Sequence, residues 1–137
     1  MSTRVVSELL DTKNRHVYSI SPEVNMQDAL QIMVSERISC LLVTRGGDVV
    51  GILSERDYIR KAVPKRLAPW DVKVKDIMTE KVICVTPVDT IRDCMELMSS
   101  NRIRHLPVVD GKALVGMLSI SDIVRALGPA RIDFPPS

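Results

Sequence analysis

Hydrophobic positions near the start of the chain form five short segments. A β-prone run at residues 17–20 ends at a Ser-Pro pair, which removes a backbone donor. Apolar residues at helical spacing follow Asn25, a polar residue with an acidic residue three positions on, as at a helix start. Apolar runs at residues 38–44 and 49–53 flank a Gly-containing turn, which indicates a hairpin, and a helix is predicted over residues 55–62. The pattern therefore predicts strand, helix, strand, strand and helix.

The same five segments recur in the second half of the chain. A β-prone run at residues 82–85 ends at Thr-Pro, and a helix is predicted to start at Thr90. A second hairpin is predicted from the apolar runs at residues 103–109 and 113–118, and a second closing helix over residues 120–127. The chain is therefore predicted to contain one structural unit twice.

A direct overlay supports this duplication. Residues 17–60 align with residues 82–125 without a gap, and 16 of the 44 positions are identical. Such a repeat indicates that one unit cannot bury its apolar face alone, and the seam between two units is a natural place for two similar clefts. We expect four parts: a first unit with the N-terminal segment at residues 1–63, a linker at 64–73, a second unit at 74–128 and a tail at 129–137.

Length and composition favour a globular protein that is not a nucleic-acid binder. The 137 residues are 45% hydrophobic and 26% charged, which suits one compact module with its own core. A net charge of +2, with one Trp, two Tyr and one Phe, offers little to attract phosphates or stack on bases.

The N-terminal residues and the cysteines point to a reducing, cytoplasmic location. The first 16 residues carry scattered charge, and nowhere are there about 18 uninterrupted apolar residues, so neither a signal peptide nor a membrane span is expected. Cys40, Cys84 and Cys94 are odd in number and lack metal-site spacing. We expect reduced cysteines in the core or lining a pocket, and no metal site.

Four segments resemble those of a pair of cystathionine-β-synthase (CBS) domains, also called a Bateman module. They are residues 75–79 (KDIMT), 102–110 (RIRHLPVVD), and the closing motifs at 51–57 (GILSERD) and 116–122 (GMLSISD). The resemblance implies an α+β module in which two sheets pack about a pseudo-twofold axis, usually dimerised through its helices. It also implies that adenosine-containing ligands bind in clefts between the units.

The closing motifs allow two interpretations. Ser54 with Asp57, and Ser119 with Asp122, are near relatives of the capping box, so both pairs could simply start a helix. A carboxylate at this place can also accept hydrogen bonds from the two hydroxyls of a ribose, and the resemblance implies this role for the Asp and ribose or phosphate binding for the Ser. We favour binding, with capping as a second role of the same residues.

Basic residues near these motifs differ between the copies. Arg104 and His105 are either a surface charge and a core imidazole, or, as the resemblance implies, phosphate ligands. The first copy has Ser39 and Cys40 there, and Arg56 could supply the charge instead. The two pockets are therefore expected to be unequal, and binding is expected to strengthen as the pH falls from 8 towards 6, because His105 gains charge.

The adenine base is expected near the first strands. The resemblance implies backbone and apolar contacts there, which map to Tyr18, Val82 and Ile83, with Thr79 nearby. These positions are equally β-prone core candidates. Neither a nucleophile–base pair nor a Gly-rich phosphate loop is recognisable, so we expect no enzyme activity and no catalytic cofactor.

Two functions are consistent with these observations. The first is a regulatory sensor that binds AMP or a related adenine nucleotide, with NAD and S-adenosylmethionine left open as ligands. The second is a protein-interaction module that dimerises or docks on a client enzyme without a ligand. We also expect an isologous homodimer, with its contact made by the apolar helix faces that carry Leu30, Met33, Met95 and Met98.

Overall fold

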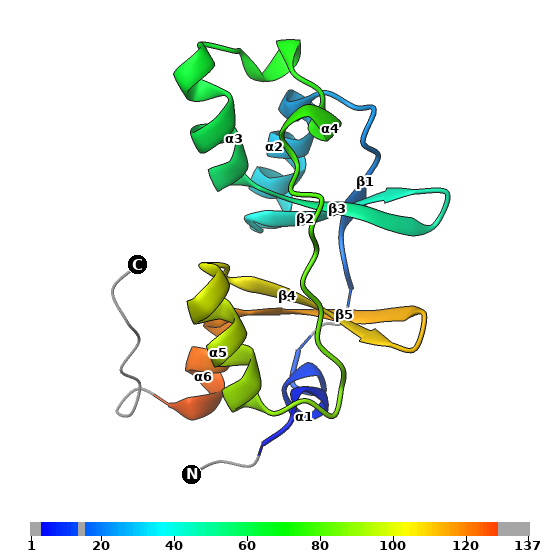
Figure 1. Cartoon of the computed structure of the whole chain (residues 1–137), viewed down its shortest axis with the longest axis vertical. Coiled ribbons are helices and arrows are strands. Elements are labelled where there is room, and N and C mark those ends of the chain that lie inside the picture. Colours follow the sequence, from blue (N-terminus) through cyan, green and yellow to red (C-terminus); the bar gives the residue numbers. More distant parts are fainter. Residues whose placement is uncertain (1–3, 14–15, 129–137) are drawn as a thin grey trace. The chain divides into compact units, whose positions relative to one another are not determined.

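The computed structural model describes residues 4–13 and 16–128, which form two compact units (Figure 1). The middle unit comprises residues 17–82. The terminal unit comprises the N-terminal segment up to His16 together with the chain from Ile83 onward. The predicted tail at residues 129–137 lies outside the described residues. Each unit combines a small sheet with helices, which confirms the predicted α+β class, and sheet-to-sheet packing stays a prediction.

The middle unit contains a three-stranded sheet in the order β1-β2-β3, with β1 parallel to β2 and β2 antiparallel to β3. Its elements, in chain order, are β1 (Ser19–Ile20), α2 (Met26–Glu36), β2 (Cys40–Arg45), β3 (Asp48–Ser54), α3 (Glu55–Lys61), the 3₁₀ helices η1 (Val63–Lys65) and η2 (Pro69–Asp71), and α4 (Val74–Ile77). The predicted hairpin and both predicted helices are present. The predicted linker is not a plain connection, since it forms η1 and η2.

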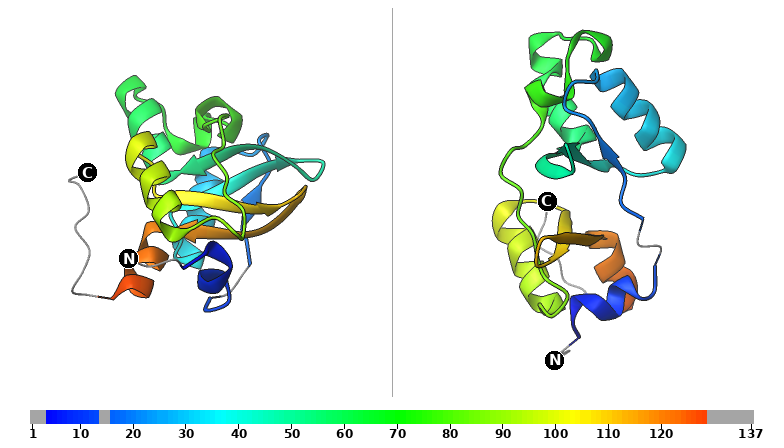
Figure 2. Two further views of the ribbon diagram at one scale, coloured as in Figure 1. Left: turned by 60° about the horizontal axis from the view of Figure 1, so that its bottom comes forward. Right: turned by 90° about the vertical axis from the view of Figure 1, so that its right-hand side faces the viewer.

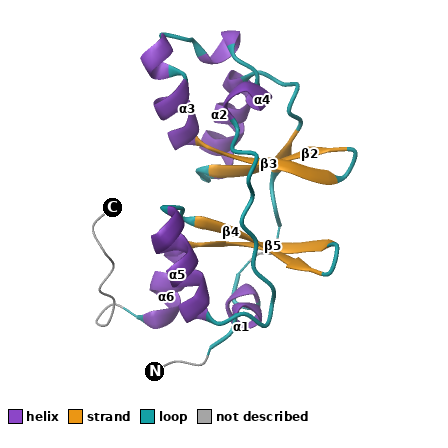
Figure 3. Cartoon of the chain, in the orientation of Figure 1, coloured by secondary structure: helices purple, strands orange, loops and turns teal. Residues whose placement is uncertain are grey.

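The terminal unit contains a two-stranded antiparallel sheet, β4-β5. Its elements are α1 (Val6–Leu10), α5 (Ile91–Asn101), β4 (His105–Asp110), β5 (Ala113–Ser119) and α6 (Ile120–Leu127). Within each unit the helices lie on one face of the sheet (Figure 3). The hairpin, α5 and α6 agree closely with the prediction.

The predicted strand at residues 82–85 does not form, and a proline explains the difference. In the middle unit the Leu42 N–H donates to the Tyr18 carbonyl at 3.1 Å and so holds the first strand. The equivalent of Leu42 in the terminal unit is Pro107, which has no N–H to donate. Only Val85 remains paired there, in an isolated bridge to Val108.

Each leading segment packs with the other copy of the repeat. Helix α1 precedes the first copy but belongs to the terminal unit, where the Val6 N–H donates to the Asp89 carbonyl at 2.9 Å. Helix α4 precedes the second copy but belongs to the middle unit, where the Val74 N–H donates to the Val24 carbonyl at 2.9 Å. The predicted bounds 1–63 and 74–128 therefore describe the sequence repeat, whereas the compact units exchange these segments. Two views of the chain from other sides show α1 beside α6 (Figure 2).

Glycines at equivalent positions admit the leading helices. A Cβ atom on Gly116 would lie 2.8 Å from Leu10 Cδ2, and one on Gly51 would lie 2.7 Å from Met78 Sδ. Both distances are shorter than packed carbon or sulfur atoms allow. The bare backbone of β3 and of β5 is therefore the surface on which α4 and α1 rest.

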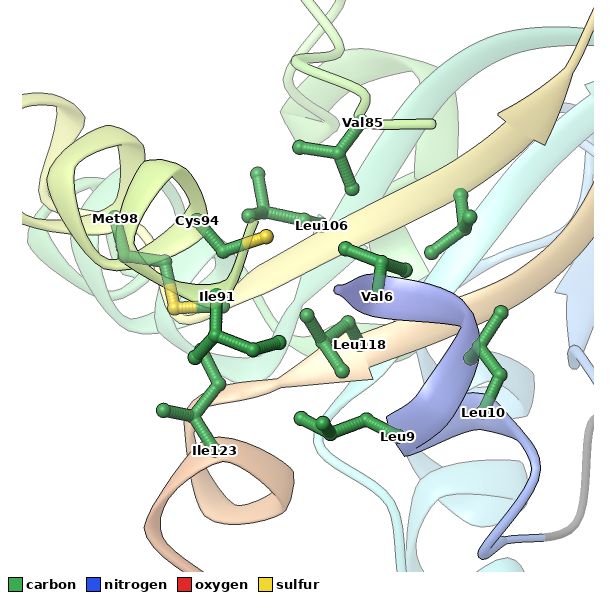
Figure 4. Close-up of a cluster of buried hydrophobic side chains, with 11 residues drawn as sticks. Val6, Leu9, Leu10, Val85, Ile91, Cys94, Met98, Leu106, Leu118 and Ile123 are labelled. Atoms are coloured by element: carbon green, nitrogen blue, oxygen red, sulfur yellow. The ribbon is translucent and has the colours of Figure 1, made fainter. Parts of the chain in front are cut away.

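Each unit has its own hydrophobic core. Figure 4 shows the terminal core, in which side chains of α1 meet those of α5, β5 and α6; its buried members are Val6, Leu9, Leu10, Val85, Ile91, Cys94, Met98, Leu106, Val108, Leu118 and Ile123. The middle core is formed by Ile20, Met26, Ala29, Met33, Leu41, Val43, Leu53, Ala62, Val72, Val74 and Ile77. Cys40 and Cys94 are buried as expected, but Cys84 is exposed. No helix among the described residues is long and apolar enough to cross a membrane.

The exchange of segments predicts energetic coupling between α1 and the second copy. Gly116→Ala should lower the free energy of unfolding by about 1–3 kcal/mol, because the added methyl overpacks the contact with Leu10. Leu10→Val should relieve part of that loss, with a coupling energy of at least about 0.5 kcal/mol in a double-mutant cycle. Denaturant unfolding of the two single variants and the double variant measures it.

The matched control pairs Leu10→Val with Gly51→Ala, whose added methyl contacts Met78 instead. Those two changes should be additive within about 0.5 kcal/mol. Coupling of Leu10 to Gly51 rather than to Gly116 would contradict the exchange.

Candidate functional site

The two closing motifs lie where the second strand of each hairpin runs directly into a helix. Strand β3 ends at Ser54 and α3 begins at Glu55, while β5 ends at Ser119 and α6 begins at Ile120. Both serines are the N-cap residue, and each forms a complete capping box with the aspartate three positions on. The capping interpretation is therefore confirmed for both motifs, which leaves the question of what else each carboxylate contacts.

Asp57 is held on one side by its capping box and is partly open on the other. Its Oδ2 accepts the Ser54 N–H at 2.8 Å and lies 3.2 Å from Ser54 Oγ. Its Oδ1 accepts the Thr79 hydroxyl at 3.2 Å and lies 3.4 Å from Lys61 Nζ. That ammonium also donates to the carbonyls of Ile77 and Met78, at 3.0 and 3.4 Å, so Asp57 has only a share of it.

Asp122 is held more tightly. Its Oδ2 accepts the Ser119 N–H at 2.8 Å, the Ser119 hydroxyl at 3.0 Å and the Lys13 ammonium at 2.7 Å, while Oδ1 pairs with Arg125. The Asp122 side chain is 5% exposed, compared with 15% for Asp57. Burial favours the neutral acid, but hydrogen bonds from Lys13 and Ser119 outweigh burial and hold the pKa of Asp122 below its ordinary value.

The residues opposite the capping serines differ between the units. Cys40 pairs with Ser54 across β2 and β3, and His105 pairs with Ser119 across β4 and β5. Burial, with a smaller contribution from the Asp57 charge, raises the pKa of Cys40 to about 12, so its thiol stays neutral. Burial also lowers the pKa of His105. The charge of Asp122 raises this pKa, and the charges of Lys13 and Arg104 lower it further. His105 therefore gains its charge at a lower pH than an ordinary imidazole does.

The arginines predicted to bind phosphate carry no ion pair within the part of the chain that the structure describes. Arg104 is exposed, and its carbonyl accepts the N–H of Ile120 at 2.9 Å. Arg56 is half-buried at the start of α3, one residue before Asp57. Both guanidinium groups are thus available to an anion.

The structure places only some of the residues predicted to surround the base. Thr79 lies at Asp57, since its backbone pairs with Ile52 and its hydroxyl donates to the carboxylate. Tyr18 is half-buried against the middle core. Val82 is the last residue of the middle unit, and Ile83 is the first of the terminal unit and packs on the terminal core. The core interpretation is thus confirmed for Tyr18 and Ile83, and contact with a base stays a prediction.

Two lysines at the carboxylates are absent from the predicted set. Lys61 follows Asp57 by four residues on α3, and this i,i+4 spacing could have revealed it. Lys13 precedes Asp122 by 109 residues and arrives with α1, so no local pattern signals it. A separate hollow of about 340 Å³ next to the motif is lined by Leu30, Met33, Val34, Arg37, Ile38, Ser39 and Glu55, and does not include Asp57.

The lowered pKa of His105 predicts a stability change in weakly acidic solution. In the unfolded chain the imidazole takes up its proton near pH 6.5, whereas in the folded chain it does so only at lower pH. Between these values the unfolded state binds more protons, so the free energy of unfolding should fall as the pH drops below about 6.5. Urea unfolding between pH 8 and 5 measures this slope.

His105→Gln should flatten the slope in this range, because the side chain at residue 105 then no longer titrates. An unchanged slope in His105→Gln would contradict the assignment.

Comparisons with known proteins agree with this geometry. The CBS domain model matches residues 6–63 and 74–129. The chain is 43% identical over 105 residues to the CBS domain-containing protein CBSX3, mitochondrial, of Arabidopsis thaliana. This match covers 73% of the present chain but only 51% of that protein. The CBS-domain containing protein ATU1752 from Agrobacterium tumefaciens is 32% identical, with a TM-score of 0.87 over 91% of this chain and 94% of that one. A hexameric CBS-CP12 protein from bloom-forming cyanobacteria is 27% identical, with a TM-score of 0.79 over 90% and 67% of the two chains. The chain therefore belongs to the CBS-domain family and contains two CBS domains in tandem.

Proposed function

We propose that this CBS-domain pair is a regulatory module that binds an adenosine-containing nucleotide, with AMP as the leading candidate. The observation that carries the proposal is the Asp57 carboxylate at the start of α3. Its Oδ2 is fixed by Ser54, while its Oδ1 meets a neutral hydroxyl at 3.2 Å and a shared ammonium at 3.4 Å. A carboxylate that is fixed on one side and weakly held on the other is suited to accept a new donor.

The hydroxyls of a ribose are donors of the required kind. A ribose is neutral, so its hydroxyls replace the Thr79 hydroxyl at Asp57 without any change in charge. The capping box holds the carboxylate in place beforehand, so little side-chain freedom is lost on binding. Capping and ribose binding are therefore compatible roles of Asp57.

The cations around Asp57 suit the phosphate of AMP. Arg56 lies next to Asp57 in the chain and is half-buried without an ion pair in the described residues. Arginine binds phosphate through two parallel N–H bonds, and partial burial strengthens such bonds. Near Asp122, Arg104 and His105 are the corresponding candidates. NAD and S-adenosylmethionine carry the same adenosine, so the melting-temperature measurements below compare all three ligands.

Exposed apolar residues favour protein docking as a second candidate function. Val34 on α2 is 80% exposed and Trp70 in η2 is 66% exposed. The predicted dimer face needs one correction, because Met33 and Met98 are buried in the cores of their own units, and Met33 contributes only to the wall of the hollow next to α2. Leu30 remains beside Val34 in the hollow next to α2. Assembly of CBS-domain proteins is illustrated by the hexameric cyanobacterial relative.

Asp57→Asn tests the proposed ribose contact. The amide keeps the size of the side chain but loses the charge, and a hydrogen bond to a charged group contributes about 1.5–3 kcal/mol. AMP affinity should therefore fall about ten- to a hundredfold, as measured by calorimetry on protein freed of bound ligand.

The unliganded melting temperature of Asp57→Asn provides the control for folding. AMP, NAD or S-adenosylmethionine should raise the melting temperature of the wild type, because a ligand that binds only the folded state stabilises it. If none of the three raises it and no binding heat is observed, the interaction module is the better explanation. Unchanged AMP affinity in Asp57→Asn and in Asp57→Asn/Asp122→Asn would place the ligand elsewhere.

Val34→Glu tests association through α2. We expect the wild type to sediment as a dimer at about 10–50 μM, where specific interfaces of standard size persist, and Val34→Glu to shift it to monomer. Val88 is 78% exposed but lies outside the helices, so Val88→Glu is the matched control and should leave the dimer intact. A monomeric wild type would exclude the proposed homodimer.

A further inference from the structure

The terminal unit holds Asp122 with a cation from a distant part of the chain. Lys13, which follows α1, places its ammonium 2.7 Å from Asp122 Oδ2 and 2.8 Å from the Met117 carbonyl oxygen. The Lys13 side chain is only 27% exposed, so this ion pair is partly shielded from water. Lys13 therefore lies at the carboxylate that corresponds to the proposed ribose contact.

The middle unit shows which groups Lys13 replaces. There the Ile52 carbonyl, the equivalent of Met117, accepts the Thr79 N–H at 2.9 Å. The Asp57 carboxylate, the equivalent of Asp122, accepts the Thr79 hydroxyl at 3.2 Å. A single ammonium in the terminal unit thus meets both the Met117 carbonyl and the capping oxygen Oδ2 of Asp122. In the middle unit the corresponding carbonyl meets a backbone N–H, and a neutral hydroxyl meets the other carboxylate oxygen, Oδ1 of Asp57.

This substitution changes what Asp122 can bind. A carboxylate has about four acceptor positions, and those of Asp122 meet Ser119 N–H, Ser119 hydroxyl, Lys13 and Arg125. Arg125 is 68% exposed and can swing away, but displacement of Lys13 would leave the Met117 carbonyl without its donor. A neutral hydroxyl would replace a charge-assisted bond about twice as strong as its own.

We propose that Lys13 is a specificity-determining residue that closes the Asp122 carboxylate to a ribose, so that each chain binds a nucleotide through Asp57 only. This inference rests on the proposed nucleotide binding. Nucleotide specificity then depends on which leading segment reaches each capping aspartate. At Asp57 the leading segment supplies the Thr79 hydroxyl at 3.2 Å and the Lys61 ammonium of α3 lies 3.4 Å away, whereas at Asp122 the leading segment supplies an ammonium at 2.7 Å.

Calorimetric titration of the full chain with AMP tests this inference. The wild type should bind about one AMP per chain, and Asp122→Asn should bind it with an affinity within about twofold of the wild type, because the carboxylate takes no part. Lys13→Met keeps the length of the side chain without its charge and should bind about two AMP per chain. The second equivalent should be lost again in Lys13→Met/Asp122→Asn.

Lys112→Met is the matched control, since Lys112 lies exposed in the turn between β4 and β5 and the change removes the same charge. It should leave the stoichiometry at about one. Lys13→Arg, which retains a cation, should also bind about one AMP, whereas a merely structural role of Lys13 would not alter the stoichiometry in any variant.

Several results would overturn the inference while leaving the proposed function intact. They are two AMP per wild-type chain, a tenfold loss of affinity in Asp122→Asn, or a folded Lys13→Met that binds no additional AMP. Should Lys13→Met fail to fold by circular dichroism, the Asp122→Asn titration still decides. Absence of binding of AMP, NAD and S-adenosylmethionine to both the wild type and Lys13→Met would instead contradict the proposed function itself, and this inference with it.

Discussion

The contact between each leading helix and a bare glycine of the other copy's hairpin is the constraint on which both candidate sites depend. Gly51 lets Met78, the residue directly after α4, and Gly116 lets Leu10 of α1 approach the backbone of β3 and β5 to distances that a single methyl group would prevent. Because α4 lies there, Thr79 reaches Asp57. The same core packing that completes each small unit therefore also selects the partner of its capping carboxylate.

The capping aspartates combine a structural and a chemical role without conflict. One oxygen of Asp57 completes the capping box, which typically contributes about 0.5–2 kcal/mol to helix stability. The other oxygen faces the Thr79 hydroxyl, which the leading segment supplies, and the Lys61 ammonium of α3, and it is held less strongly. A residue that must stay in place for the fold is thereby preorganised for a ligand, and the cost of orienting it has been met during folding.

Much of the fold could be predicted from the sequence, because its signals are local. Helix starts at Asn25 and Thr90, the Gly-containing turns and both capping boxes depend on residues within four positions of each other. The exchange of leading segments could not be predicted from the sequence, because the hydrophobic pattern of a short helix such as α1 does not indicate which copy it packs against. The absence of a strand at residues 82–85 could be predicted only by aligning Pro107 with Leu42, because the Leu42 N–H holds the equivalent strand and a proline has no N–H.

The contacts of the candidate site between residues close in sequence were predicted, and the contact between residues far apart in sequence was missed. Ser54 and Asp57 lie together as their spacing required, but Lys13 meets Asp122 across 109 residues. This lysine makes the two copies differ more than their 16 identical positions suggest. A duplicated unit can retain its capping aspartate for stability in both copies while only one copy holds the outer oxygen of that carboxylate weakly. Divergence in the exchanged segment is then sufficient to separate folding from binding, because that segment supplies the group that meets the carboxylate.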